Sequence, residues 1–202
     1  MPDTLLPIPE AKRADAAPAL HPLIAARWSP RAFDPGRPLG EVDVLPLLEA
    51  ARWAASASNI QPWRFAWALR GEAGFDALLG CLAASNAAWA HRAGALMLGC
   101  AVQDTPDGKP NRHAAHDLGQ ALAQLTLQAT ATGIAVHQMG GFDVEQARLA
   151  MRVPAGTEPF TALALGWPGD ASLLEERMRL REAAPRERLP LASTALRGGW
   201  PG

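Results

Sequence analysis

The sequence contains few cysteines and no long apolar run. Its two cysteines, Cys81 and Cys100, have neither a neighbouring cysteine nor a nearby pair of histidines, which argues against a disulfide framework and a metal site. We expect buried free thiols in a reducing compartment. No segment approaches the roughly 20 apolar residues of a membrane span, and the N-terminus lacks a basic flank followed by an apolar signal core. These absences predict a cytoplasmic protein.

Charge is also scarce. Charged residues make up 19% of the 202 residues, below the ~25% of typical soluble domains, and the formal net charge is -1. Without a basic excess, a nucleic acid or an anionic membrane is not an expected partner. Hydrophobic residues reach 49%, which leaves apolar surface for an oligomeric contact. The length suits one domain with a sizeable core, preceded by a proline-rich arm over residues 1–18.

The most unusual stretch is AASASNIQPWRF at 54–65, where small and amide-bearing residues crowd one turn. Serine and asparagine side chains compete with helical hydrogen bonds, so a preceding helix should end here and expose backbone N–H groups. Such a loop suits recognition of a flat polar ligand. The same composition also suits a plain helix-to-strand turn, and the segment alone does not separate the two interpretations. The residues concerned are Ser56, Ala57, Ser58, Asn59 and Gln61.

A second polar motif is RWSPRAF at 27–33. Arg27 and Arg31 bracket Ser29, and guanidinium groups with a hydroxyl are the donors that a phosphate needs. Taken alone, the motif is better explained by solvated surface arginines.

Hydrophobic periodicity predicts alternating helices and strands. Residues 113–132 should form the core helix, ended by Gly133, and the apolar run at 95–102 should form a buried central strand. Pro46 fits its helix only in the first turn. Asp143 should cap a helix with Gln146 as its capping-box partner. Helices are expected at 20–27, 43–55, 72–84, 86–92, 113–132 and 175–183, and strands at 63–69, 95–102, 134–139 and 160–167.

His113, His116 and Asp117 invite a metal interpretation. Helical zinc pairs are spaced i, i+4 with a glutamate between them, whereas these histidines are spaced i, i+3 without one. We therefore interpret them as polar residues at a helix end. Gly140 and Gly141 indicate either a close approach of backbone to a ligand or a turn with unusual torsions.

Taken in order, these motifs resemble the FMN-dependent nitroreductase family. Each motif is weak alone, but their joint order and spacing are specific, and together they cover most of the chain after residue 18. The matching segments are RWSPRAF at 27–33, SASNIQPWRF at 56–65, NAAWAHRA at 86–93, DLGQALAQLTLQATATGI at 117–134, GGFD at 140–143, ALGWPGD at 164–170 and RERLPL at 186–191.

The resemblance implies a three-layer α+β fold, with a mixed, mainly antiparallel sheet covered by helices, in an intertwined homodimer. It implies FMN at the subunit interface, with arginines on the phosphate, the serine-rich turn of the other subunit on the ribityl chain, and Asn86 on the pyrimidine edge. The implied cofactor-binding set is Arg27, Trp28, Ser29, Arg31, Ser56, Ala57, Ser58, Asn59, Gln61, Asn86, Gln138, Met139, Gly140, Gly141, Arg186 and Arg188.

The implied activity is ping-pong oxidoreduction. NADH or NADPH would reduce the flavin and leave, and a nitroaromatic, quinone or similar electron-poor acceptor would take the electrons at the same face. The flavin carries the chemistry, so no catalytic protein residue is expected. Family members often carry a proline at position 55, a lysine at 186 and sometimes a glutamate at 140, where this chain has Ala55, Arg186 and Gly140.

Two alternatives stay open. One is a specialised flavin enzyme on the same scaffold: an enone reductase, a dehalogenase or an oxidase. The other is a flavin-binding module without turnover.

Overall fold

Strand β2 (Ala95–Val102) is the centre of the sheet, as its continuous apolar sequence predicts. The computed structural model describes residues 6–14, 16 and 18–200, and in it a four-stranded sheet has the order β1-β2-β4-β3. The outer strands are β1 (Trp63–Leu69) and β3 (Ala135–Met139), and β4 (Thr157–Gly166) lies between β2 and β3. All three pairings are antiparallel, and the register of β2 with β4 shifts between Gly99 and Cys100, where Phe160 is the extra residue of β4. Among the described strands there is no parallel pairing.

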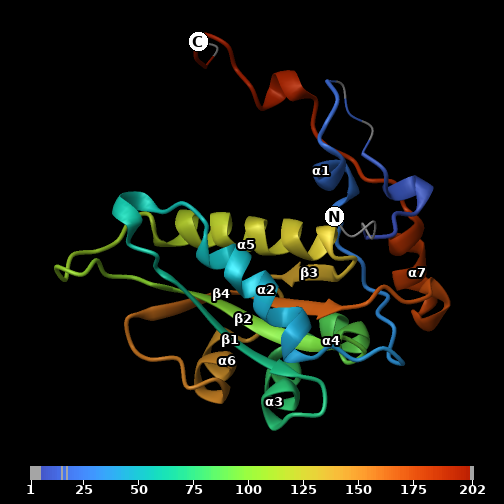
Figure 1. Ribbon diagram of the computed structural model, residues 1–202, viewed down its shortest axis with the longest axis horizontal. Coiled ribbons are helices and arrows are strands. Elements are labelled where there is room, and N and C mark those ends of the chain that lie inside the picture. The colour runs from blue at the N-terminus through green and yellow to red at the C-terminus, as the bar shows by residue number, and fades with distance from the viewer. Residues whose placement is uncertain (1–5, 15, 17, 201–202) are drawn as a thin grey trace.

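Helices cover both faces of this sheet and make a three-layer α+β fold (Figure 1). One face carries α2 (Glu41–Arg52) and α5 (Ala114–Ala131), and the other carries α3 (Ala73–Cys81), α4 (Ala84–Ala90) and α6 (Val144–Ala150). Two further helices lie toward one end of α5: α1 (Pro22–Ala26) packs against it, and α7 (Glu176–Ala183) lies further out. The three-layer prediction is confirmed.

The alternation of side chains along β2 divides the core in two. Leu96 and Leu98 belong to the cluster under α3, α4 and α6, whereas Ala95 and Met97 belong to the cluster under α2 and α5. Because both faces of the strand are covered, neither side needs polar residues. Burial of each large side chain contributes roughly 1.5–3 kcal/mol, so the central strand is a major source of stability.

Helix boundaries follow local capping. Asp143 accepts a hydrogen bond from the backbone N–H of Gln146 at the start of α6, which confirms the predicted cap. The reciprocal capping-box bond to the Gln146 side chain was predicted wrongly, because the Asp143 N–H donates to the carbonyl oxygen of Cys81. Gly133 follows α5 with φ of 79°, which a glycine adopts without strain. Helix α2 begins at Glu41, where the Asp43 carboxylate accepts a hydrogen bond from the N–H of Gly40. Pro46 therefore lies in the second turn of the helix. The prediction that it lies in the first turn was wrong.

Cys81 and Cys100 are both free and buried, as predicted. Burial raises the pKa of the Cys100 thiol to about 11. The part of the chain that the structure describes contains no helix with the length and apolarity needed to cross a membrane. Part of the predicted arm, residues 1–5, 15 and 17, lies outside the described residues.

Candidate functional site: an arginine cluster and a strained turn

Arg186 fastens the C-terminal segment to the end of α1. Its guanidinium donates hydrogen bonds to the carbonyl oxygens of Ala25 and Arg27, the latter a very short contact. These carbonyls belong to the last turn of α1, where backbone acceptors lack partners within the helix. The contact spans about 160 residues of sequence and places the RWSPR segment against the tail.

Arg27, Arg186 and Arg188 form a cluster of positive charge. Burial is the main cause that lowers the pKa of Arg27, and the neighbouring Arg188 lowers it further. The pKa of Arg186 is lowered by burial and then by Arg27 and Arg188. Among the described residues no carboxylate forms an ion pair with any of the three. The Ser29 hydroxyl lies 3.5 Å from a terminal nitrogen of Arg27, so a hydroxyl donor borders the cluster.

Arg31 faces a different environment. Its guanidinium lies 3.7 Å from the carboxylate of Glu182 on α7, and its positive charge is partly balanced there. Trp28, between the two arginine positions, is buried, and the Lys12 ammonium lies 5.4 Å from the centre of its ring. The Trp28 indole N–H has no hydrogen-bond partner in the described structure.

The end of β3 adjoins the arginine segment. The Nδ1 atom of His137 lies 3.0 Å from the carbonyl oxygen of Pro30, and its ring is 4.6 Å from that of Trp89. Burial and then the nearby Arg31 lower the pKa of His137 to about 4, so the ring is neutral and Nδ1–H donates to Pro30. His137 thus joins three segments: 27–31, α4 and β3.

Residues 138–141 continue this surface. Gln138 is exposed, its amide nitrogen lies 3.3 Å from the Thr126 hydroxyl, and Met139 is buried. The Asn86 side chain donates to the carbonyl oxygen of Gly141 at 3.0 Å, so the structure brings these two predicted site positions together. An added Cβ on Gly140 would meet no protein atom within 4 Å, so the chain's own packing does not require glycine there.

The turn after α2 is conformationally strained. Ser58, Asn59 and Gln61 have φ angles of 50°, 55° and 53°, in the left-handed region that favours glycine. Residues held in this region cost free energy and cluster at ligand-binding sites. The turn is stabilised from within, because the Gln61 N–H donates to the Ser56 hydroxyl and the Gln61 amide donates to Asn59.

Asp117 anchors the turn from α5. This carboxylate is 1% exposed, accepts a hydrogen bond from the Ala57 N–H at 3.0 Å, and lies 2.9 Å from Nδ1 of His116. The described residues contain no group of three or more potential metal ligands, so the metal interpretation of this helix end gains no support. Asp117 instead connects the turn to the first turn of the core helix.

Comparison with known proteins decides the family. A model described as "Nitroreductase family" matches residues 24–81. An uncharacterized 15.4 kDa protein of Mycolicibacterium smegmatis is 44% identical over 126 residues, which is 62% of this chain and 84% of that protein. A solved oxidoreductase containing FMN is 33% identical with a TM-score of 0.89, covering 96% of this chain and all of the other. The chain belongs to the nitroreductase family. A nitroreductase family protein of Clostridium difficile, 23% identical over 88% of this chain and 97% of its own, shares the fold with a TM-score of 0.68.

In this member of the nitroreductase family, the strained turn and the arginine cluster lie far apart within one chain. The turn is fastened to Asp117 near the start of α5, while α1 and α7 lie toward its other end (Figure 1). At the other end of α5, the carbonyl oxygen of Thr130 accepts a hydrogen bond from the N–H of Leu6 in the N-terminal segment. Thr130 is 13 positions after Asp117, so at 1.5 Å per residue the two lie about 20 Å apart along the helix axis.

Sequence reasoning missed the side chains that support these groups. Lys12 and Glu182 were not predicted to take part, although both are buried beside the arginine segment. Asp117 was interpreted as a polar residue at a helix end, without a role in the turn. The contacts of these three side chains join residues that lie 60 to 172 positions apart, so no local pattern announces them.

Proposed function

We propose that this chain is an FMN-dependent oxidoreductase that takes electrons from NADH or NADPH and reduces an electron-poor organic acceptor. The observation that carries the proposal is the cluster of Arg27, Arg186 and Arg188 without a carboxylate partner among the described residues. A phosphate monoester carries close to two negative charges and meets guanidinium groups with charge-assisted hydrogen bonds. The family's FMN-containing relative supports FMN as the occupant.

The residues present fit such a cofactor. In the proposed site the arginines, with Ser29 and Arg31, hold the phosphate, and Trp28 backs this segment from the core. In the proposed site Asn86, Gln138, Met139, Gly140 and Gly141 border the ring. The space beside Gly140 is free of protein atoms and leaves its backbone open to a flat ligand, whereas Gly141 gives room to the Asn86 side chain. When bound, FMN supplies the redox chemistry, and the chain supplies placement and access for two ligands in turn.

We further propose that a second copy of the chain completes the site. The predicted contact of the turn with the ribityl chain requires Ser56, Ala57, Ser58, Asn59 and Gln61 beside the phosphate group. Within one chain the turn lies at the opposite end of α5 from α1 and α7 (Figure 1). A homodimer that places the turn of one copy against the arginine cluster of the other resolves this separation.

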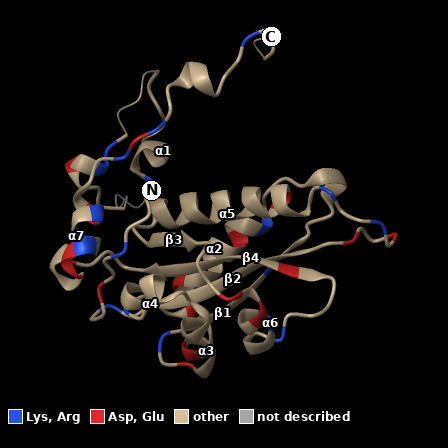
Figure 2. Ribbon diagram, turned by 180° about the vertical axis from the view of Figure 1, so that it is seen from behind, with Lys and Arg blue, Asp and Glu red and all other residues tan. Residues whose placement is uncertain are grey.

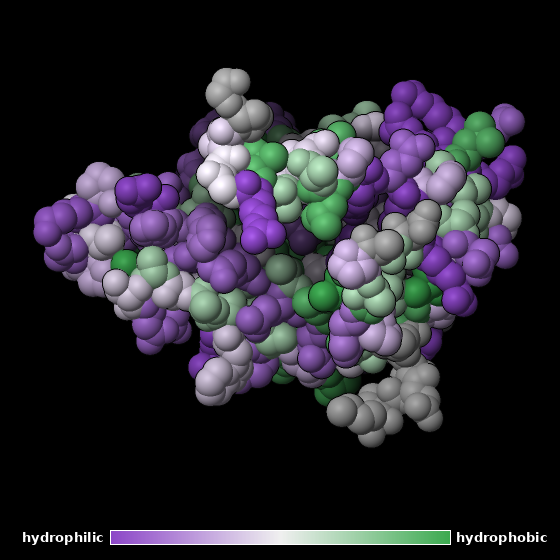
Figure 3. Space-filling view, turned by 90° about the horizontal axis from the view of Figure 1, so that it is seen from above, coloured by the Kyte–Doolittle hydropathy of each residue, from purple (hydrophilic) through white to green (hydrophobic). Residues whose placement is uncertain are grey.

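The surface supports an extended contact between copies. The C-terminal segment projects away from the sheet (Figure 1) and exposes Leu189 (74%), Leu191 (62%) and Trp200 (89%). Val42 on α2 is 82% exposed, and Trp53, which directly follows α2, is 71% exposed. Seen from the side of α5 and the C-terminal segment, several hydrophobic patches interrupt the polar surface (Figure 3). In this proposal residues 19–202 form one FMN-binding domain, whose C-terminal arm lies over the partner, and residues 1–18 form an N-terminal arm.

The test is spectroscopic and kinetic. The purified protein, loaded with FMN, should show the absorption of bound flavin, lose it anaerobically with NADH or NADPH, and regain it when a nitroaromatic or quinone is added. Steady-state rates against nitroaromatics, quinones, enones and dioxygen then separate a general reductase from a specialised one. Tightly bound flavin that neither nicotinamide reduces would favour a binding module and contradict the proposal.

A further inference from the structure

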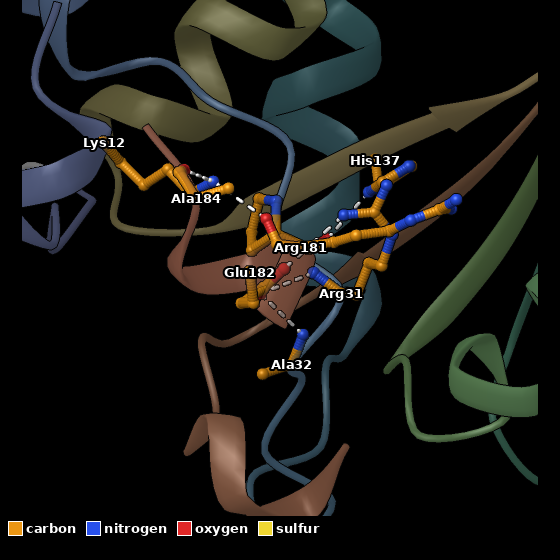
Figure 4. Close-up of polar contacts among 8 residues, drawn as sticks. Lys12, Arg31, Ala32, His137, Arg181, Glu182 and Ala184 are labelled. Carbon is orange, nitrogen blue, oxygen red and sulfur yellow. Dashed lines mark hydrogen bonds and ion pairs between the residues drawn. The ribbon is translucent and has the colours of Figure 1, made fainter. Parts of the chain in front are cut away.

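Glu182 places a buried carboxylate next to the proposed phosphate site. It lies on α7, is 6% exposed, and its Oε1 accepts hydrogen bonds from the backbone N–H groups of Arg31 at 2.8 Å and Ala32 at 3.1 Å (Figure 4). Its Oε2 lies 3.7 Å from the Arg31 guanidinium and has no hydrogen-bond partner among the residues that the structure describes. One side chain therefore fixes both the backbone and the side chain at the end of the RWSPR segment.

Helix α7 is in turn held by Lys12. The Lys12 ammonium donates to the carbonyl oxygens of Arg181, at 3.1 Å, and Ala184 at the C-terminal end of α7, where backbone acceptors lack helical partners (Figure 4). Lys12 is only 7% exposed. Burial lowers its pKa, while Glu182 acts in the opposite direction and favours the charged form. The N-terminal segment, α7 and the arginine segment thus form one connected unit.

The sign of the Glu182 charge is unfavourable for anion binding. Basic and acidic residues gather around α7 and its neighbours, whereas α5 carries few charges (Figure 2). Among these charges Glu182 is a buried carboxylate beside Arg31, and its negative charge repels a phosphate bound at the RWSPR segment. A buried charge of the same sign as the ligand lowers the affinity by repulsion. The affinity rises only if the charged group contributes more free energy by holding the binding groups in position.

We propose that Glu182 is a positioning residue of the anion site, which raises FMN affinity by fixing residues 31–32 and so orienting Arg27 and Ser29, in spite of its negative charge. This inference rests on the proposed function. For the removal of the Glu182 charge, this proposal and simple electrostatic repulsion predict opposite changes in FMN affinity. Removing the charge should tighten FMN binding if repulsion dominates, and should weaken it if the two backbone hydrogen bonds and the Arg31 pair hold the segment in place.

The experiment compares FMN with riboflavin, which has the same ring and ribityl chain but no phosphate. Dissociation constants are measured by flavin fluorescence for the full chain, Glu182→Gln, Glu182→Ala and the matched control Glu176→Gln, an exposed glutamate of the same helix. We expect Glu182→Ala to weaken FMN by about tenfold or more, as loss of hydrogen bonds to a charged group does, with riboflavin unchanged. Glu182→Gln, which keeps an acceptor for the backbone but not the ion pair, should lie between.

Other outcomes overturn the inference. Unchanged or tighter FMN binding in Glu182→Ala would show that repulsion dominates, and equal losses for FMN and riboflavin would show a general role in folding. If Glu182→Ala does not fold, the isosteric Glu182→Gln decides the question. The same comparison is made, between its change in dissociation constant for FMN and its change for riboflavin. Failure of the unaltered chain to bind FMN would instead overturn the proposed function itself, and with it this inference.

Discussion

The carboxylate of Asp117 accepts a hydrogen bond from the backbone N–H of Ala57, 60 residues earlier in the chain, and this contact ties a strained turn to the core helix. Three residues of the turn have positive φ angles, so its conformation depends on external support. The serine-rich segment is therefore held in shape by a side chain outside the motif itself.

Asp117→Ala should loosen this turn. We expect a loss of about 1–3 kcal/mol in the free energy of unfolding, because a partly buried N–H loses its partner, together with weaker FMN binding. Urea denaturation and flavin fluorescence measure the two effects. Asp76→Ala, which removes an exposed carboxylate from α3, is the control and should change neither. An Asp117→Ala protein with unaltered FMN affinity would contradict the role of the anchored turn.

Replacing Arg27 and Arg188 together by alanine should release FMN. Each charge-assisted hydrogen bond contributes about 1.5–3 kcal/mol, so the dissociation constant should rise by roughly a hundredfold or more. The unliganded protein should be as stable as before or slightly more stable, because two of three clustered positive charges are gone. Arg177→Ala with Arg179→Ala, two exposed arginines of α7, controls for net charge. Retained stoichiometric flavin would refute the phosphate assignment.

Mixed dimers test whether the turn acts across the subunit interface. One variant carries Arg27→Ala and Arg188→Ala, and the other carries Asn59→Gly and Gln61→Gly, where glycine tolerates the positive φ angles. Each homodimer should bind FMN poorly. In a co-expressed heterodimer, purified through two different tags, the arginines of one copy meet the turn of the other, so one intact site is regained per dimer. If arginines and turn act within the same chain, the heterodimer gains nothing.

His137 should make stability depend on pH. Its folded-state pKa is lowered from 6.5 to about 4, so between these values the unfolded chain binds a proton that the folded chain does not. The stabilisation that comes from keeping His137 neutral is therefore complete above pH 6.5 and is lost as the pH falls towards 4. The loss is at most about 3.5 kcal/mol, at ~1.4 kcal/mol per pKa unit. Urea denaturation of the original protein and of His137→Gln at pH 7.5 and 5 measures the difference. The exposed His91→Gln, which also removes one imidazole, is the control.

Much of the fold follows from local sequence. The strands at 63–69 and 95–102 have the predicted limits, and α5 spans Ala114–Ala131 where residues 113–132 were expected. These segments have strong periodicity or continuous apolar character, and Gly133 marks the helix end. The predicted strand at 160–167 begins earlier, at Thr157, because Glu158 and Pro159 pair with β2 despite a composition that is unfavourable for strands.

The candidate site is less accessible to local reasoning. Motif spacing identified Asn86 and Gly141, which the structure places in contact, and it identified the arginines that cluster. It did not reveal Glu182 or Lys12, whose roles arise only when α7 packs against segments 150 or more residues away. Nor did it reveal that the turn and the arginines lie at opposite ends of α5, because that separation depends on tertiary packing.

The arginine cluster also bears on how much of this protein a cell can maintain. The described residues place no counter-charge beside these three cations, which repel one another. An anion that binds them stabilises the folded chain, by an amount that rises with the logarithm of its free concentration relative to its dissociation constant. The supply of riboflavin, from which FMN is made, then affects how much of the chain is folded and how much is degraded. In riboflavin-starved cells the steady-state amount of the chain should fall even when its messenger RNA is unchanged.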